Sequence, residues 1–277
     1  MGELTVDPLL ETRSVRIRDV CCRGSCRHES DEECSRSTHL VFPYRGVYVR
    51  RVGREQAVAE ASQVMFFNAQ EGYRVSHPVA GGDANLSIDI DHDVLRELAP
   101  APMLQGGATL AFKSQRQRID ARAQALVALL RHGLRQGIAE PLEAEGLALT
   151  LIRRTLGPRT RHERTATHGR QRLVDRAKLV LATDPARRWT LAEIAAQVGG
   201  SPGHLTRVFQ QVEGMPLYRY QRQLRLARAL ALISEYDDLT ALGLDLGFSS
   251  HSHFTAAFRE VYGRTPSEFR DAAIGRK

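Results

Sequence analysis

The chain has 277 residues, 42% of them hydrophobic, with 39 Lys and Arg against 32 Asp and Glu and a formal charge of +7. That apolar content is enough to bury a core, which excludes a disordered chain or a fibre. No run of about 18 apolar residues occurs, and charges interrupt the first 20 residues, so the sequence indicates neither a membrane span nor secretion and predicts a cytoplasmic protein.

The charge is unevenly distributed along the chain. Residues 1–150 hold 18 basic and 20 acidic side chains, whereas residues 151–277 hold 21 and 12. The basic excess therefore lies in the second half. This asymmetry is typical of a polyanion-binding half joined to a half with another task, although a solvated basic face is an alternative reading.

Short strands are expected between residues 38 and 90. The segments HLVFPYRGVYVRRV, QVMFFN, YRVSHPV and LSIDID alternate or run apolar, with Gly, Pro and Asn between them and no helical stretch. This pattern favours a small antiparallel barrel or sandwich over about residues 10–95. His77, beside a proline turn, is interpreted as structural rather than as a ligand.

Two amphipathic helices are expected over about residues 115–156, because apolar residues recur there at three- and four-residue steps. They either cap the barrel or offer an apolar stripe to a second copy, and a homodimer is the expected assembly. Residues 157–170 are basic and lack apolar periodicity, which predicts a linker. The predicted domains are thus a sensor and dimerisation domain, 1–156, and an all-helical domain, 171–277.

The helical domain contains an internal repeat. HLTRVFQQVEG, from His204, matches HFTAAFREVYG, from His253, at a constant offset of 49 residues. A short helical stretch and a Gly/Ser turn precede each copy, and residues 216–233 carry the pattern of a long connecting helix. Two helix-turn-helix units joined by a long helix are therefore predicted, with the second helix of each unit suited to a DNA major groove.

Residues 189–270 resemble the DNA-binding domain of the AraC/XylS family of bacterial transcription regulators. The residues that carry the resemblance in the second unit are Gly247, Phe248, His253, Phe254, Phe258, Gly263, Thr265, Pro266, Phe269 and Arg270. Many members of that family place a cupin-like barrel and dimerising helices ahead of this domain. The resemblance therefore implies an α+β protein with a cupin-like antiparallel β-barrel, dimerisation helices and a C-terminal all-α domain.

The resemblance also implies a function. The chain would be a sequence-specific transcription regulator that binds double-stranded DNA, with RNA polymerase as a possible further partner, and not an enzyme. Its two recognition helices would enter successive major grooves roughly 34 Å apart. The base-reading positions would be Gly203, Thr206, Arg207, His251, Ser252, Thr255 and Ala256.

Two residues depart from the family pattern. Gly243 stands where the family usually has alanine, which predicts a weaker helix. Ala256 offers no hydrogen bond where a longer side chain is common, so the second recognition helix is expected to contribute more phosphate contact than base reading.

Cysteines and histidines gather in the segment CCRGSCRHESDEECSRSTH. Thiolates and imidazoles at these spacings predict a Zn²⁺ site in which the N-terminal domain senses metal. The predicted ligands are Cys22, Cys26, Cys34 and His39, with Cys21 and His28 as alternates. There are two alternatives: a thiol pair senses the redox state, or the thiols are inert.

Two other functions stay open at this point. Some regulators with this DNA-binding domain are also zinc-cysteine alkyl-acceptor proteins, and Cys22 and Cys26 form a similar start, although no second C-x2-C pair follows. A metal-dependent cupin enzyme fused to a DNA-binding domain ranks lower, because the His/Glu set of such enzymes is missing.

Overall fold

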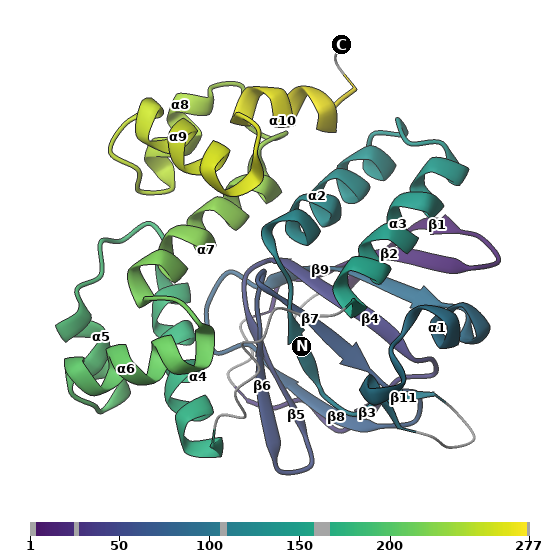
Figure 1. Cartoon of the computed structure of the whole chain (residues 1–277), viewed down its shortest axis with the longest axis horizontal. Coiled ribbons are helices and arrows are strands. Elements are labelled where there is room, and N and C mark those ends of the chain that lie inside the picture. The colour runs from purple at the N-terminus through teal and green to yellow at the C-terminus, as the bar shows by residue number, and fades with distance from the viewer. Residues whose placement is uncertain (1–3, 25–27, 106–109, 158–166, 276–277) are drawn as a thin grey trace.

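The computed structural model describes residues 4–24, 28–105, 110–157 and 167–275. An N-terminal half of antiparallel sheets, to residue 157, is followed by a helical C-terminal half, from residue 167 (Figure 1). Cys26 and residues 158–166 of the predicted linker lie outside the described residues. Within the described residues, no helix has the length and apolarity needed to cross a membrane.

The larger sheet has six strands in the order β1-β2-β9-β4-β7-β12, with neighbours antiparallel. Its strands are β1 (Leu4–Glu11), β2 (Val15–Cys22), β9 (Asp83–Ile90), β4 (His39–Arg45), β7 (Gln63–Phe67) and β12 (Arg116–Arg118). Alternation fixes which face each side chain joins: Val15 and Ile17 of β2, like Leu86 and Ile88 of β9, belong to one apolar core.

A smaller sheet of four strands, in the order β3-β8-β5-β6, lies against the other face of the larger sheet. Its strands are β3 (Glu33–Cys34), β8 (Gly72–Ser76), β5 (Tyr48–Val52) and β6 (Glu55–Ala59). Side chains of both sheets pack between them, including Tyr48 and Ala59 from the smaller sheet and Met65 and Phe67 from the larger. The strands predicted between residues 38 and 90 are thus present, arranged as two facing sheets.

Helices cover the opposite face of the larger sheet. They are α1 (His92–Leu98), α2 (Ala121–Arg135) and α3 (Pro141–Leu156). Between α1 and α2 the chain forms a one-turn 3-10 helix (Ala101–Met103) and the short strands β10 (Leu104–Gln105) and β11 (Ala111–Phe112). The sequence predicted helix from about residue 115, but β12 occupies residues 116–118. This triplet, Arg-Gln-Arg, has no apolar residue and so gave no strand signal.

The C-terminal half is helical throughout. Its helices are α4 (His168–Thr183), α5 (Leu191–Val198), α6 (Pro202–Glu213), α7 (Leu217–Leu232), α8 (Leu239–Asp245), α9 (His251–Tyr262) and α10 (Pro266–Ala273). The first three enclose one apolar cluster with the start of α7, and the last three enclose another with its end (Figure 1). Helix α7 is therefore the long connecting helix that the sequence predicts.

Buried ion pairs join the two halves beside α4. Lys178 Nζ lies 2.8 Å from Glu213 Oε1 of α6 and 3.3 Å from Glu60 Oε1, just after β6, and all three side chains are at most 3% exposed. Two arginines of β12 extend the network: Arg116 pairs with Asp175 of α4, and Arg118 donates to the Glu213 carbonyl. The short polar strand thus connects the larger sheet to the helical half.

We expect Lys178→Met to lower the free energy of unfolding by about 3–5 kcal/mol, because it leaves two buried carboxylates without their cation. Urea denaturation of the full chain measures this loss. Combining Lys178→Met with Glu60→Gln and Glu213→Gln removes the uncompensated charge and should recover most of the stability. The exposed ion pair of Arg16 with Glu11 supplies the control, since Arg16→Met should change the free energy of unfolding little. An equally small effect of Lys178→Met would contradict a stabilising role for the buried ion pairs.

Candidate nucleic-acid interface

Helices α5 and α6 form a tight helix pair. Helix α5 begins with a capping box between Thr190 and Glu193 and ends at Gly199, whose φ of 73° is left-handed. Ser201 then accepts a hydrogen bond from the His204 N–H and starts α6. Leu205, Val208 and Phe209 are buried on one side of α6, which fixes the opposite side toward solvent.

The predicted base-reading residues of α6 lie on that solvent side. Gly203 and Arg207 are exposed and Thr206 is half-buried. The Thr206 hydroxyl donates to the Pro202 carbonyl at 3.0 Å, so its lone pairs, rather than its proton, face outward. An Arg207 Nη atom lies 3.4 Å from His204 Nδ1. The exposed face therefore presents a guanidinium, an imidazole and no acidic group.

Helices α8 and α9 repeat this arrangement. The left-handed Gly247, with φ of 81°, follows α8, and Ser250 caps α9 by accepting from the His253 N–H. The four predicted residues of α9 line one shallow hollow together with Arg259, Glu260 and Thr265; they are His251, Ser252, Thr255 and Ala256. His251 lies between the hydroxyls of Thr240 and Thr255, at 3.3 Å from each.

Arg225 of α7 holds the two helix pairs together. Its guanidinium donates to the carbonyls of Pro185, Ala186 and Gly247 at 2.8 to 3.0 Å. Gly247 lies so close that an added Cβ would stand 2.2 Å from the Ala186 carbonyl oxygen. Arg225 is one of four arginines spaced three residues apart along α7, and nothing in the sequence distinguishes it from the other three.

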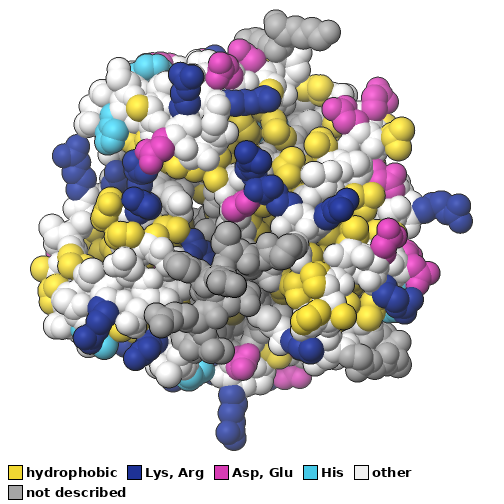
Figure 2. Space-filling view, in the orientation of Figure 1, with side chains coloured by type: hydrophobic (Ala, Val, Ile, Leu, Met, Phe, Trp, Pro, Cys, Tyr) yellow, Lys and Arg dark blue, Asp and Glu magenta, His cyan; other side chains and the backbone are white. Residues whose placement is uncertain are grey.

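Lys and Arg side chains are spaced over the helical half in the view of Figure 2. Several are engaged within the protein: Arg222 pairs with Glu260 of α9 at 2.9 Å, and Arg187 pairs with Glu193 at 2.6 Å. The exposed Arg207 and Arg259 make no ion pair with a described residue. They are therefore the cations of α6 and α9 that remain available to an anionic partner.

Gly243 has a packing role that the sequence did not reveal. It lies in the middle of α8, where a Cβ would approach three atoms of the Phe254 side chain, including its Cβ, to 3.0 Å. The residue predicted to weaken the helix is thus the one that lets α8 pack closely on α9.

Gly243→Ala should lower the thermal stability of the protein. The gain in helix propensity, about 1 kcal/mol, is smaller than the cost of overpacking, about 1–3 kcal/mol. Gly146→Ala, in the middle of α3 with no atom within 4 Å of the new Cβ, is the control and should stabilise. A Gly243→Ala protein as stable as the Gly146→Ala protein would show that α8 and α9 separate at little cost.

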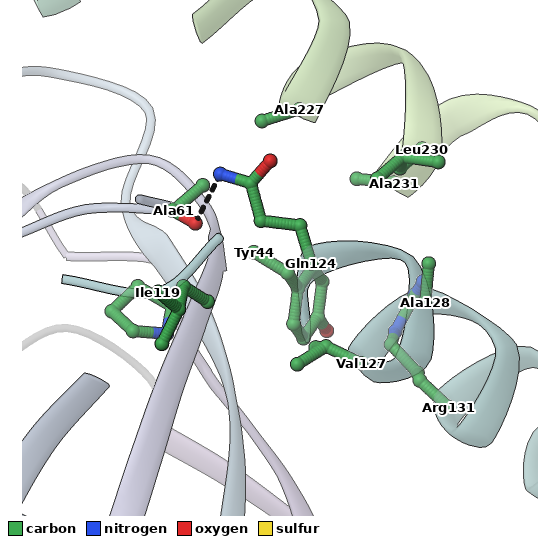
Figure 3. A pocket seen from close by; sticks show the side chains of 11 residues that line it. Tyr44, Ala61, Ile119, Gln124, Val127, Ala128, Arg131, Ala227, Leu230 and Ala231 are labelled. Carbon is green, nitrogen blue, oxygen red and sulfur yellow. Dashed lines mark hydrogen bonds between the residues drawn. The ribbon is translucent and has the colours of Figure 1, made fainter. Parts of the chain in front are cut away.

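Helix α2 of the N-terminal half contacts α7, α9 and α10. His132 Nε2 lies 3.0 Å from the Leu230 carbonyl, and Ser234 Oγ lies 3.1 Å from His132 Nδ1. A small cavity nearby is lined by α2, α7 and the larger sheet, with Gln124 donating across it to the Ala61 carbonyl (Figure 3). Its free volume of about 20 Å³ is room for a single water molecule.

His132 makes this contact sensitive to pH. Burial lowers its pKa to about 4, and the nearby Arg131 and Arg135 also lower it, whereas the Leu230 carbonyl and Asp19 raise it. The folded protein therefore binds this proton less readily than the unfolded chain, whose histidines titrate near 6.5. The stability that neutral His132 contributes is complete above about pH 6.5 and is lost as the pH falls toward 4.

We expect His132→Gln, which keeps a donor for the Leu230 carbonyl but does not titrate, to flatten the fall in stability between about pH 7 and pH 4. Urea unfolding at several pH values measures the slope. The exposed His28 provides the matched variant, because His28→Gln should keep the wild-type slope. Equal slopes in all three proteins would place the pH sensitivity elsewhere.

Of the predicted zinc ligands, the three that the structure describes, Cys22, Cys34 and His39, do not form a cluster. Cys34 lies on β3, exposed and paired with β8, while His39 stacks on Phe67 with ring centroids 5.0 Å apart. Cys22 lies instead near His77 and Asp83, the only cluster of three potential ligands among the described residues. Of the alternates, His28 is exposed and Cys21 points to the Asp19 carboxylate and the Tyr44 hydroxyl. Cys22, Cys34 and His39 lie on three different strands, β2, β3 and β4, so closeness in sequence does not place their side chains together.

Residues 194–272 match a family model described as a helix-turn-helix domain. The transcriptional activator RhaR of Klebsiella pneumoniae is 32% identical over 134 residues, which are 48% of this chain and 46% of that protein. The regulator GadX of Escherichia coli is 33% identical over 93 residues, 33% of this chain and 34% of that protein.

Among solved structures, a transcriptional regulator with an AraC-type DNA-binding domain from Chromobacterium violaceum is 31% identical. It covers 38% of this chain and 95% of its own, with a TM-score of 0.37. The chain matches less than half the length of the first curated relatives.

These matches define the C-terminal half as a helix-turn-helix domain. The C-terminal half of the chain is thus similar to the DNA-binding domains of transcription regulators, among them a putative AraC-like regulator of Streptomyces antibioticus. Its relatives are regulators and not enzymes, and the alkyl-acceptor alternative finds no support among them.

Proposed function

We propose that this protein is a sequence-specific DNA-binding transcription regulator in the cytoplasm. The observation that carries the proposal is the duplicated exposed face: α6 and α9 each follow a left-handed glycine, each begin at a serine cap and each turn polar residues to solvent. We infer that these are the recognition helices of two helix-turn-helix units. Helix α7 and Arg225 hold them at a fixed separation, as reading of successive major grooves requires.

In this proposal the two recognition helices contribute differently. Arg207 reads a base edge, since a guanidinium meets guanine with two hydrogen bonds. Gly203 allows close approach of the backbone, and Thr206 offers hydroxyl lone pairs. In α9, His251, Ser252 and Thr255 contact bases or phosphates, while Ala256 supplies an apolar contact only. Arg259, beside them, binds phosphate.

The N-terminal half is proposed to be a sensor built as a cupin-like barrel. Two facing antiparallel sheets support this assignment. The sensor would act through its two contacts with the helical half, one at Lys178 and the other along α2. An effector that favours one arrangement of these contacts would shift the population of the form that binds DNA.

Dimerisation is proposed through the outer face of α3. Helix α2 lies between the larger sheet and the helical half, so it has little surface for a second copy. Helix α3 exposes Leu142, which is 81% accessible. Leu142→Glu should then weaken self-association, as measured by sedimentation equilibrium, with no change in secondary structure. RNA polymerase is a further proposed partner of the DNA-bound dimer.

The test of the proposed function begins with selection of binding sites from random duplex DNA by the full chain. Arg207→Ala should then weaken binding to the selected site by about 1–3 kcal/mol and relax the preference at one base pair. Fluorescence anisotropy with a set of single-base variants, at one fixed salt concentration, measures both effects.

Arg54→Ala is the matched control, because it removes the same charge from an exposed turn of the smaller sheet. It should leave both affinity and preference unchanged. If the Arg207→Ala protein binds the selected site with wild-type affinity and wild-type base preference, then Arg207 does not read a base. Failure of the full chain to enrich any sequence would contradict the proposed function itself.

A further inference from the structure

Three side chains with metal-binding atoms converge at one end of the two sheets. Cys22 is the last residue of β2, Asp83 is the first residue of β9, and His77 directly follows β8 of the smaller sheet. One ligand atom from each, the thiol sulfur, an imidazole nitrogen and a carboxylate oxygen, lies within 4.8 Å of the other two. None of these residues contacts the proposed DNA-reading face.

The backbone fixes two of the three positions. Cys22 and Asp83 are direct partners in the antiparallel pairing of β2 with β9, so their side chains lie on the same face of the larger sheet. The turn that leads into Asp83 passes over Cys22: Gly82 has a φ of 67°, and a Cβ there would stand 2.0 Å from the Cys22 carbonyl oxygen. The pair is therefore held in place before any ligand binds.

Asp83 is poorly satisfied by the protein alone. Its side chain is 4% exposed. Asn85 donates to Oδ2, whereas Oδ1 receives no hydrogen bond of acceptable geometry from a described residue. His77 Nε2 is only 2.7 Å from Oδ1, but that short contact is misaligned for a hydrogen bond, which leaves the buried oxygen aimed into the cluster. A buried carboxylate oxygen without a donor is costly unless a cation lies beside it.

We propose that Cys22, His77 and Asp83 form a zinc site between the two sheets, bound through Cys22 Sγ, His77 Nε2 and Asp83 Oδ1. Sulfur, nitrogen and oxygen ligands together suit Zn²⁺ better than Mg²⁺ or Ca²⁺, which prefer oxygen alone. Tetrahedral ligands at about 2.0–2.1 Å from zinc lie about 3.3 Å apart, so His77 and Asp83 need to separate by only about 0.6 Å. Water fills the fourth position of such a three-ligand site.

The competing explanation is a buried His–Asp ion pair beside a thiol, with no metal. The two explanations differ in what they require of Cys22, because an ion pair does not need its thiolate. They also differ from the site expected on sequence grounds, in which Cys34 and His39 would be ligands. Metal content and thiol chemistry separate all three.

The experiment measures zinc in the full chain, purified under reducing conditions without chelator and again after stripping and reloading. We expect about one zinc per chain. Cys22→Ser, His77→Gln and Asp83→Asn should each lower zinc affinity at least tenfold in competition with a chromogenic chelator. Cys34→Ser and His39→Gln are the matched controls, and both should keep wild-type affinity.

Cobalt substitution of the wild-type protein gives a readout that needs no variant. Co²⁺ bound at this site should show a thiolate-to-metal charge-transfer band and the intense d–d bands of four-coordination. Zinc should also protect Cys22 from alkylation, as read by mass spectrometry of the peptide that contains it. These two measurements decide the question even if a ligand variant fails to fold.

Zinc below about one tenth per chain after reloading, with no charge-transfer band, would overturn the proposal and favour the ion pair. A second result would overturn the proposal in favour of the ligand set expected from the sequence. That result is loss of zinc in Cys34→Ser or His39→Gln together with full retention of zinc in His77→Gln and Asp83→Asn. Both results leave the proposed DNA binding untouched, so failure of one proposal is distinguishable from failure of the other.

Discussion

The placement of the two halves depends on one buried cation, Lys178, set between Glu60 and Glu213. Each partner comes from a different layer: the lysine from α4, one carboxylate from the sheets and the other from the end of α6. Burial alone would raise the pKa of Glu213, but Lys178, Arg118 and Arg116 together lower it below its usual value, which favours the ionised carboxylate. Helix α6 is thereby tied to the N-terminal half at its C-terminal end.

An ionic contact of this kind has a consequence that an apolar one lacks. Charges buried at an interface recover their hydration when the interface opens, so the desolvation that opposes docking also makes separation inexpensive. The contact along α2 is different, because Ala128 and its neighbours join the apolar cluster around α7, α8 and α9. The helical half is thus held by two different contacts with the N-terminal half. The contact at Lys178 is ionic, whereas the contact along α2 consists of apolar packing and neutral His132, so the two respond to different conditions.

The elements of the helical half could be predicted from sequence because their signals are local. Polar caps such as Ser201 and Ser250, glycines in turns such as Gly199 and Gly247, and a 3.6-residue apolar period are all local signals, and they indicate α5, α6, α8 and α9. The outward placement of Arg207 and His251 follows from the same period. The apolar period could not show that the close contact with Phe254 requires glycine at position 243, because this contact depends on the distance between α8 and α9.

Long-range contacts account for the rest of what the sequence did not reveal. Strand β12 has no apolar residue, and its arginines matter only because α4 and α6 lie opposite them. Lys178 is charged in a helix rich in charges, so it resembles a solvated residue until Glu60 is placed beside it. In both cases a charged side chain is buried beside a partner more than 50 residues away in the chain. The free-energy cost of burying the charge is compensated only by that partner, which the fold brings close.

The two adjacent cysteines show how strand geometry decides chemistry. Because neighbouring side chains on a strand point to opposite faces, Cys21 and Cys22 enter different environments although they are consecutive. Cys21 faces the helices, where it contacts Tyr44 and Asp19 beside Arg131 of α2. Cys22 faces the second sheet, beside His77 and Asp83. One strand therefore places one thiol of the cluster on the face of the larger sheet that α2 covers and the next in the space between the two sheets. The partners of each thiol are set by strand register rather than by sequence spacing.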